Sequence, residues 1–313
     1  MDVLSDILSF LELEVQLYFR ADLRSPWGLT VPAHRNVARF HIVTQGTAFV
    51  KVPGIEEMVT LKEGDIILIL HGSSHDLLYH PDSDQRPLDE VLQDVDFQGG
   101  VLSYGGDGAE TSMVCGHFGF DEEAVHPILE ALPRYIKVSA TKEYGFRWLD
   151  FAMGFIGAET RASMPGAEAI SSRLAEIMLI QVLRIYLNIA DRPATVLAGV
   201  FDPHIGKALE IMHKAPGGSW TLETLAEEIG MSRTSFATRF KRLMGVSPMK
   251  YLARWRVQLA KHQLVKSKKA VYQIAFDLGY QSEAAFTKVF KKYMKTTPSA
   301  FRRRSTSDAV KVD

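Results

Sequence analysis

Residues 225–248 read LAEEIGMSRTSFATRFKRLMGVSP, and residues 274–298 read IAFDLGYQSEAAFTKVFKKYMKTTP. The two stretches share one pattern, offset by 49 residues before a turn and by 50 residues after it. Each copy reads as a short apolar helix, a glycine-containing turn and a second helix with basic residues, which is the pattern of a helix-turn-helix. The matching pairs are Ala226 and Ala275, Gly230 and Gly279, Phe236 and Phe286, Phe240 and Phe290, Met244 and Met294, and Pro248 and Pro298.

Two tandem motifs of this kind predict a sequence-specific DNA-binding domain. A recognition helix reads base edges near its N-terminal half, and basic residues elsewhere meet phosphates. Inward packing of the phenylalanines turns ten residues outward as the expected DNA-binding set: Arg233, Thr234, Ala237, Thr238, Lys241, Glu283, Ala284, Thr287, Lys288 and Lys291. Phosphate contacts are expected from Lys241 and Lys291 and from Arg239, Arg242, Lys292 and Arg302 to Arg304.

The net charge of -1 hides a separation along the chain. Residues 201–313 hold 21 Lys and Arg against 9 Asp and Glu, a net charge of +12. Residues 1–200 hold 15 against 28, a net charge of -13. A basic C-terminal part suits a phosphate backbone, whereas an acidic N-terminal part is expected to face away from DNA.

The first 135 residues predict a second domain, rich in strands. Residues 28–120 contain short apolar segments separated by Gly, Pro and Asp turns, which favour an antiparallel barrel or sandwich. Residues 81–100 read as a polar surface loop, and residues 121–200 turn helical, with an apolar stripe at 174–186. That stripe either packs within its own chain or pairs with a second copy in a homodimer. Residues 191–204 read as a linker.

The segment from Phe201 to Arg304 resembles the DNA-binding domain of the AraC/XylS family of bacterial transcription regulators. The resemblance rests on the paired readers, on the joining helix YLARWRVQLAKHQL, and on Gly279-Tyr280 followed by Ser282 and Pro298. It implies two readers in successive major grooves. Alanine at two of the matching base-contact positions shifts specificity toward neighbouring residues and DNA shape.

Residues 1–200 resemble the cupin-type N-terminal domain of a subset of that family, through FHIVTQG (40–46), LKEGDIILILHGSSH (61–75) and VCGHFGFD (114–121). The expected fold is therefore α+β: an N-terminal antiparallel, cupin-like β-barrel with helices, and a C-terminal all-α domain with two helix-turn-helix units. The expected boundaries are 1–135 for the barrel, 136–200 for a helical linker or dimerisation segment, 201–304 for the DNA-binding domain and 305–313 for a disordered tail.

The cupin resemblance raises the question of a metal. The second cupin motif keeps Gly64, Gly72 and His75, whereas the first keeps only His41. One alternative is a divalent metal held by His41 and His75, with Cys115 and His117 on one strand face as further candidates. The favoured alternative is a small-molecule site in the barrel. The expected ligand-binding residues are His41, His75, Phe40 and Phe49.

The favoured function is a cytoplasmic transcription regulator that binds double-stranded DNA and a small-molecule effector, with RNA polymerase as a further partner. One cysteine excludes an intrachain disulfide. The acidic N-terminus and the interrupted apolar runs argue against a signal peptide and a membrane span. Two alternatives stay open: a constitutive DNA-binding protein whose barrel only dimerises, and a metal-dependent cupin enzyme. The incomplete ligand set disfavours the enzyme.

Overall fold

The computed structural model describes residues 6, 14–95, 100–120, 132–139, 152, 155, 159, 165–188, 199–200 and 202–310. The chain divides into two compact units. The sheet unit comprises Leu13–Glu122 and Pro133–Ala190, and the helical unit comprises Met1–Glu12, Glu123–Leu132 and Asp191–Asp313. Much of the expected helical region at 121–200 and most of the expected linker at 191–204 lie outside the described residues.

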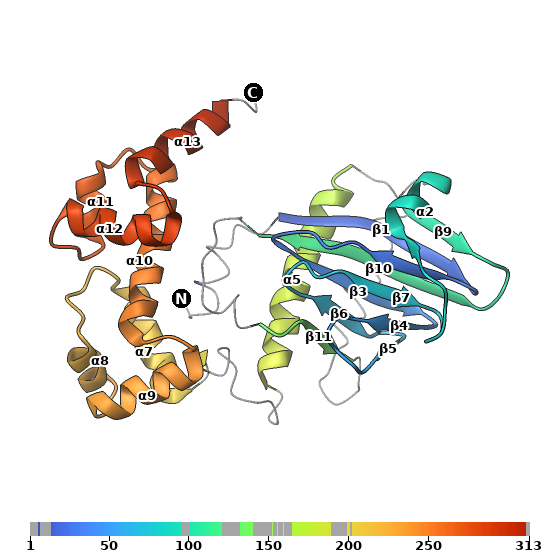
Figure 1. Cartoon of the computed structure of the whole chain (residues 1–313), viewed down its shortest axis with the longest axis horizontal. Helices are drawn as coiled ribbons and strands as arrows, with labels where there is room; N and C mark the ends of the chain where they lie inside the picture. The colour runs from blue at the N-terminus through green and yellow to red at the C-terminus, as the bar shows by residue number, and fades with distance from the viewer. Residues whose placement is uncertain are drawn as a thin grey trace. The chain divides into compact units, whose positions relative to one another are not determined.

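Two sheets build the sheet unit (Figure 1). The six-stranded sheet A runs in the order β11 (Tyr135–Val138), β6 (Ile66–Ile69), β3 (Val37–Gln45), β10 (Glu110–Gly119), β1 (Glu14–Arg24) and β9 (Val101–Gly105). The five-stranded sheet B runs in the order β5 (Val59–Lys62), β4 (Thr47–Lys51), β7 (His75–Leu78), β2 (Gly28–Val31) and β8 (Arg86–Pro87).

The cupin-like α+β fold is confirmed, but the expected antiparallel barrel is not closed. Its strands form two separate sheets, and apolar side chains from both sheets meet in one core. Two of the pairings are parallel, β1 with β9 and β2 with β8. The shared core follows from the alternation of side chains along each strand, because every second side chain points into the layer between the two sheets.

The expected polar loop at 81–100 is wrong in its middle. The segment contains β8 and the helix α2 (Leu88–Asp94). Leu88, Val91 and Leu92 recur at helical spacing, and Asp89 and Glu90 occupy the first turn, where acidic residues favour a helix. Val91 is fully buried in the core of the sheet unit. The strand β1 was also missed, because the expected strands began at residue 28.

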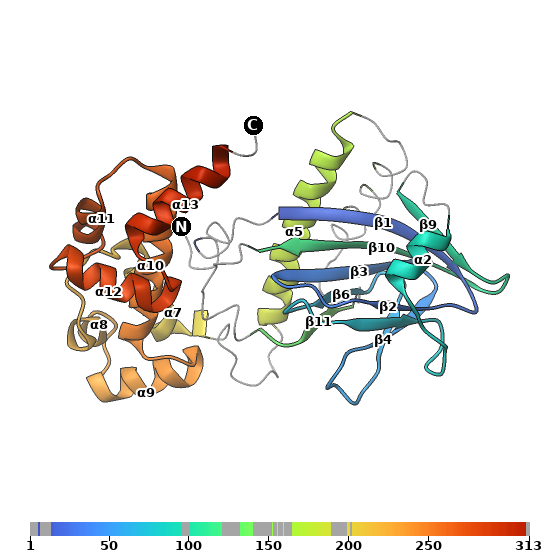
Figure 2. The ribbon, with the colours of Figure 1, turned by 45° about the horizontal axis from the view of Figure 1, so that its top comes forward.

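Helix α5 (Ala167–Asn188) lies across sheet A and contacts β1 and β11 (Figure 2). The apolar stripe at 174–186 is only partly buried: Met178, Val182 and Tyr186 are buried, whereas Ile177 remains 47% exposed. The intrachain alternative is thus confirmed for one side of the helix. The other side leaves apolar surface uncovered within the described part of the unit. No described helix is both long and apolar enough to cross a bilayer.

The helical unit contains the expected repeat. Its helices are α7 (Pro203–Lys214), α8 (Leu222–Glu228), α9 (Arg233–Met244), α10 (Pro248–Lys266), α11 (Val271–Asp277), α12 (Glu283–Met294) and α13 (Pro298–Val310). The pair α8 and α9 forms the first motif, α11 and α12 form the second, and α10 joins them (Figure 1). Buried phenylalanines four residues apart anchor both recognition helices: Phe236 and Phe240 in α9, and Phe286 and Phe290 in α12.

Helix α13 continues to Val310, into the residues 305–313 for which a disordered tail was expected. Thr297 accepts a hydrogen bond from the backbone N–H of Ala300 at the start of this helix, and Phe301 is buried beside Phe290. Neither proline nor glycine follows Pro298, so no residue stops the helix in this stretch.

Candidate ligand cavity and DNA-binding surface

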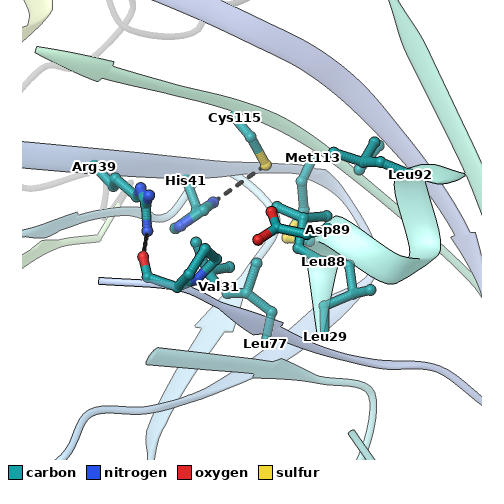
Figure 3. Close-up of a pocket in the computed structure, with 12 residues that line it drawn as sticks. Leu29, Val31, Arg39, His41, Leu77, Leu88, Asp89, Leu92, Met113 and Cys115 are labelled. Atoms are coloured by element: carbon teal, nitrogen blue, oxygen red, sulfur yellow. Dashed lines mark hydrogen bonds between the residues drawn. The ribbon is translucent and has the colours of Figure 1, made fainter. Parts of the chain in front are cut away.

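A cavity of about 170 Å³ lies in the sheet unit (Figure 3). Its walls come from β1, β2, β3, β7, β10 and α2, so segments distant in the sequence meet there. Most of the lining is apolar, and its charged or titratable members are Arg39, His41, Asp89 and Cys115. The lining residues are Ala21, Leu29, Val31, Pro32, Arg39, His41, Leu77, Leu88, Asp89, Leu92, Met113 and Cys115.

The structure brings the two predicted histidines together at this cavity. Nδ1 of His75 lies 3.3 Å from the carbonyl oxygen of Ser73, and its Nε2 lies 2.7 Å from Nε2 of His41. Nδ1 of His41 lies 3.1 Å from Sγ of Cys115. One proton arrangement satisfies all three contacts: Cys115 donates to His41, His41 donates to His75, and His75 donates to Ser73.

Burial keeps this hydrogen-bonded chain neutral. It lowers the pKa of His75 to about 4 and is the largest cause of a pKa for His41 well below its ordinary value. The positive charge of Arg39 adds to both shifts. Burial raises the pKa of the Cys115 thiol to about 12. At neutral pH all three side chains are therefore uncharged.

This arrangement does not fit a divalent metal. Zinc bound at about 2.0–2.1 Å by two imidazoles in a tetrahedral site holds their nitrogens about 3.3 Å apart, and the Nε2 atoms here are closer than that. Cys115 contacts the opposite nitrogen of the His41 ring, so it does not face the same point as His75. Within the described residues, no group of three or more His, Cys, Asp or Glu side chains is arranged to hold a metal.

Of the four expected ligand-binding residues only His41 lines the cavity, and His75 lies behind it, in contact with its ring. Phe40 lies on the opposite face of β3 from His41, where its ring packs 5.1 Å from that of Phe118. Phe49 is half-buried and absent from both the cavity lining and the core between the sheets. The correction follows from strand alternation, which sends neighbouring side chains to opposite faces.

The sequence reasoning missed the contribution of α2 to the cavity. Leu88, Asp89 and Leu92 line the side opposite His41 (Figure 3). Leu88 and Leu92 are half-buried, and Asp89 is exposed to solvent. Their spacing of one helical turn was the available signal. Arg39, a buried cation in the lining, is a further residue that the sequence reasoning missed.

The two recognition helices begin in the same way. The side chain of Ser232 accepts from the backbone N–H of Ser235 at the start of α9, and Ser282 accepts from that of Ala285 at the start of α12. The preceding turns close alike, with Met231 N–H donating to Ala226 and Tyr280 N–H donating to Ala275. Such caps orient the first turn of each helix.

The ten expected DNA-binding residues all lie on α9 and α12. Eight of them are exposed, and Ala237 and Thr287 are half-exposed. Arg233 already pairs with Glu223 of α8, with Nη1 3.0 Å from Oε1. The two helices thus present polar surfaces built from their N-terminal halves, the part with which recognition helices read base edges.

Two of the expected phosphate-binding arginines, Arg239 and Arg302, have hydrogen-bond partners within the helical unit. Arg239 donates to Oδ2 of Asp202 through Nε at 2.9 Å and Nη2 at 2.5 Å, and Asp202 also caps α7. Arg302 donates to the carbonyl oxygens of Leu264 and Lys269 near the end of α10. These contacts join helices within the unit, so the two guanidinium groups serve packing. Lys241, Arg242, Lys291 and Lys292 remain exposed.

Two protein families match the chain, one in its N-terminal part and one in its C-terminal part. Residues 2–188 match the Cupin family, and residues 225–304 match a helix-turn-helix domain family. A solved DNA-binding domain of AdpA, in complex with a target DNA, is 28% identical and covers 34% of this chain and 96% of that chain, with a TM-score of 0.33.

Full-length relatives are transcription regulators, not enzymes. The chain is 32% identical over 307 residues to a putative AraC-like transcription regulator of Streptomyces lividans, covering 98% of this chain and 99% of that protein. It is 30% identical over 315 residues to the HTH-type transcriptional regulator AlkR of Acinetobacter baylyi, covering 97% and 100%. The RCS-specific activator RclR of Escherichia coli is 29% identical over 308 residues, covering 97% and 98%. The chain therefore belongs to the AraC-like family of transcription regulators and carries a Cupin domain in front of its helix-turn-helix domain.

Proposed function

We propose that the protein regulates transcription by binding specific DNA sequences through α9 and α12, under the control of a small molecule in the sheet unit. The observation that carries the proposal is the duplicated recognition helix. Both copies have the same serine cap, the same turn closure and the same buried pair of phenylalanines. Two helix-turn-helix motifs with the same internal contacts but different exposed residues are suited to bind two different base sequences.

Within this proposal the exposed residues divide by position. Those nearest the helix N-termini read bases, including Arg233 and Thr234 in α9 and Glu283 in α12; the basic residues farther along meet phosphates. Reading successive major grooves on one face requires recognition helices roughly 34 Å apart. The long helix α10, between the two motifs, sets that separation.

The effector site is assigned to the cavity beside His41. An effector regulates only if it binds two states of the protein with different affinity. The cavity supports the assignment because its walls come from six different elements and a few polar groups, among them Arg39, His41 and Asp89, border an apolar space.

The remaining partners belong to the same proposal. A second copy pairs through the exposed side of α5, where Ile170 and Ile177 lie seven residues apart and are 40% and 47% exposed. Seven residues are two helical turns, so both isoleucines share one face. RNA polymerase is a further partner in this proposal, and the bacterial cytoplasm is where the two would meet.

Selection from a random duplex library tests the proposal. The full-length protein is expected to enrich a site with two conserved blocks about one helical turn apart. Fluorescence anisotropy then compares that site with a scrambled duplex of equal length at a stated salt concentration. A preference of about 1,000-fold or more supports sequence-specific binding. Equal affinity for both duplexes would contradict it.

A further inference from the structure

Arg39 is a buried cation that has no counter-ion among the residues that the structure describes. It lies on β3, two residues before His41 and on the same face, and it is only 6% exposed. Its Nη1 donates to the carbonyl oxygen of Pro32. Its Nε is buried without a hydrogen-bond partner, and no described carboxylate forms an ion pair with it.

A buried guanidinium without a counter-ion destabilises the folded protein unless an anion binds to it. Buried charges in proteins are normally paired and hydrogen-bonded, because removal from water is unfavourable for an ion. A guanidinium has five N–H donors in a rigid fork. With Nη1 engaged by Pro32, the edge formed by Nε and Nη2 remains, and such an edge binds a carboxylate through two parallel hydrogen bonds.

The groups around Arg39 do not neutralise it. Burial is the main cause of the lowered pKa values of His41, His75 and His117, and the charge of Arg39 lowers each further. The imidazoles are consequently neutral and contribute no negative charge. Asp89 is the one carboxylate in the cavity lining, and it lies on α2 and is exposed to solvent (Figure 3).

The other walls of the cavity favour a ligand with a hydrocarbon part. Leu29, Leu77, Leu92 and Met113 are among its walls. Its volume of about 170 Å³ is close to that of an engineered cavity of about 150 Å³ that binds benzene. A ligand therefore has space for about one six-membered ring or a short chain.

We propose that the cavity binds a small monocarboxylate, with the carboxylate on Arg39 and the hydrocarbon part between β2, β7, β10 and α2. This identification of the ligand class rests on the proposed function, which assigns the effector to this cavity. A phosphate ester fits less well, because its second negative charge would meet apolar walls and the carboxylate of Asp89. The charge on Arg39 thus specifies a singly charged head group.

Paired ligands of equal shape test the proposal on the full-length protein. Isothermal titration calorimetry compares hexanoate with hexanamide, and cyclohexanecarboxylate with cyclohexanecarboxamide. The wild type is expected to bind each acid about 10- to 100-fold more tightly than its amide, because the hydrogen bonds to Arg39 are charge-assisted. Equal affinities, or no binding of either acid at millimolar concentration, would overturn the proposal.

Variants of the cavity localise the effect. Arg39→Met is expected to remove the preference for the acid while keeping the affinity for the amide, and circular dichroism confirms that the variant is folded. Asp89→Asn is expected to strengthen acid binding, because it removes a negative charge that repels the carboxylate of the ligand. This second variant keeps the proposal testable if Arg39→Met does not fold. Arg35→Gln, which removes an exposed positive charge four residues before Arg39 in the sequence, is the matched control and should leave the preference unchanged. An unchanged preference in Arg39→Met would overturn the assignment.

Failure of the inference and failure of the proposed function give different results. Anisotropy with the selected DNA site measures whether a bound acid changes DNA affinity. Acid binding that depends on Arg39 without any change in DNA binding supports the site but contradicts regulation by this ligand. Specific DNA binding without any acid binding overturns the site and leaves the DNA-binding function standing.

Discussion

The Nε2 atoms of His41 and His75 lie 2.7 Å apart, so the two imidazoles form a hydrogen bond between β3 and β7. These strands belong to different sheets. The histidines therefore connect the two layers beside the cavity through neutral hydrogen bonds. Protonation of either ring would place two donors against each other or add a charge next to Arg39.

Acid is expected to destabilise the sheet unit through His75. Its pKa is about 4 in the folded protein and 6.5 ordinarily. Between these values the unfolded chain binds more protons, so the free energy of unfolding falls as pH falls from about 6.5 to about 4, by roughly 3 kcal/mol. Denaturant unfolding at several pH values measures this. His75→Gln is expected to flatten the dependence relative to wild type, and parallel curves for the two proteins would contradict the prediction.

Lys288→Ala is expected to reduce the affinity for the selected DNA site more than that for scrambled DNA. Lys288 is exposed in the N-terminal half of α12, and a lysine in a major groove can donate to guanine. A loss of about 1–3 kcal/mol confined to the selected site is the expected size. Anisotropy on both duplexes measures it, with the exposed Lys207→Ala on α7 as control. Equal losses on both duplexes would make Lys288 a phosphate contact.

Arg239 and Arg242 are expected to behave differently, although they are close together on α9. Arg239→Ala removes the pair with Asp202 and should lower the stability of the helical unit by about 1 kcal/mol. Arg242→Ala should leave stability nearly unchanged and lower the dependence of DNA affinity on salt. Chemical unfolding and salt titrations separate the two effects. A reduced salt slope for Arg239→Ala with unchanged stability would restore it as a phosphate contact.

The glycines of the two turns form a matched pair. Gly230 and Gly279 have φ values of +69° and +78°, so alanine strains the backbone at both positions. A Cβ at Gly230 meets nothing within 4 Å, whereas at Gly279 it would lie 2.5 Å from the carbonyl oxygen of Gly217. Gly230→Ala is expected to cost about 1 kcal/mol and Gly279→Ala more. Thermal unfolding measures both, and equal losses would show that the backbone near Gly217 adjusts.

Ile177→Glu is expected to weaken self-association. Ile177 lies on the exposed side of α5. In the proposed contact between copies, the carboxylate of a glutamate at this position would lose its water, which is unfavourable. Sedimentation velocity over a range of concentrations measures the oligomeric state. Val265→Glu, at an exposed apolar residue of the other unit, is the control. A variant that associates like wild type would place the contact elsewhere.

The helical unit could be predicted almost entirely from the sequence, because its determinants are local. Helix caps, turn glycines and phenylalanines four residues apart act within one or two helical turns. The repeat of that pattern, at Gly230 and again at Gly279, revealed the two motifs and their exposed faces. The partners of Arg239 and Arg302 were missed, because Asp202 and Leu264 are about 40 residues away in the sequence.

The sequence by itself determined the family, the two domains, the recognition helices and the two histidines beside the cavity. Only the tertiary structure decided the pairing of strands, the placement of Phe40 away from the cavity, and the contribution of α2 to the cavity wall. It also showed that Arg39 is buried without a carboxylate partner among the described residues. The physical reason is that a strand's alternation shows which side chains share a face, whereas the layer that this face meets depends on contacts between distant segments.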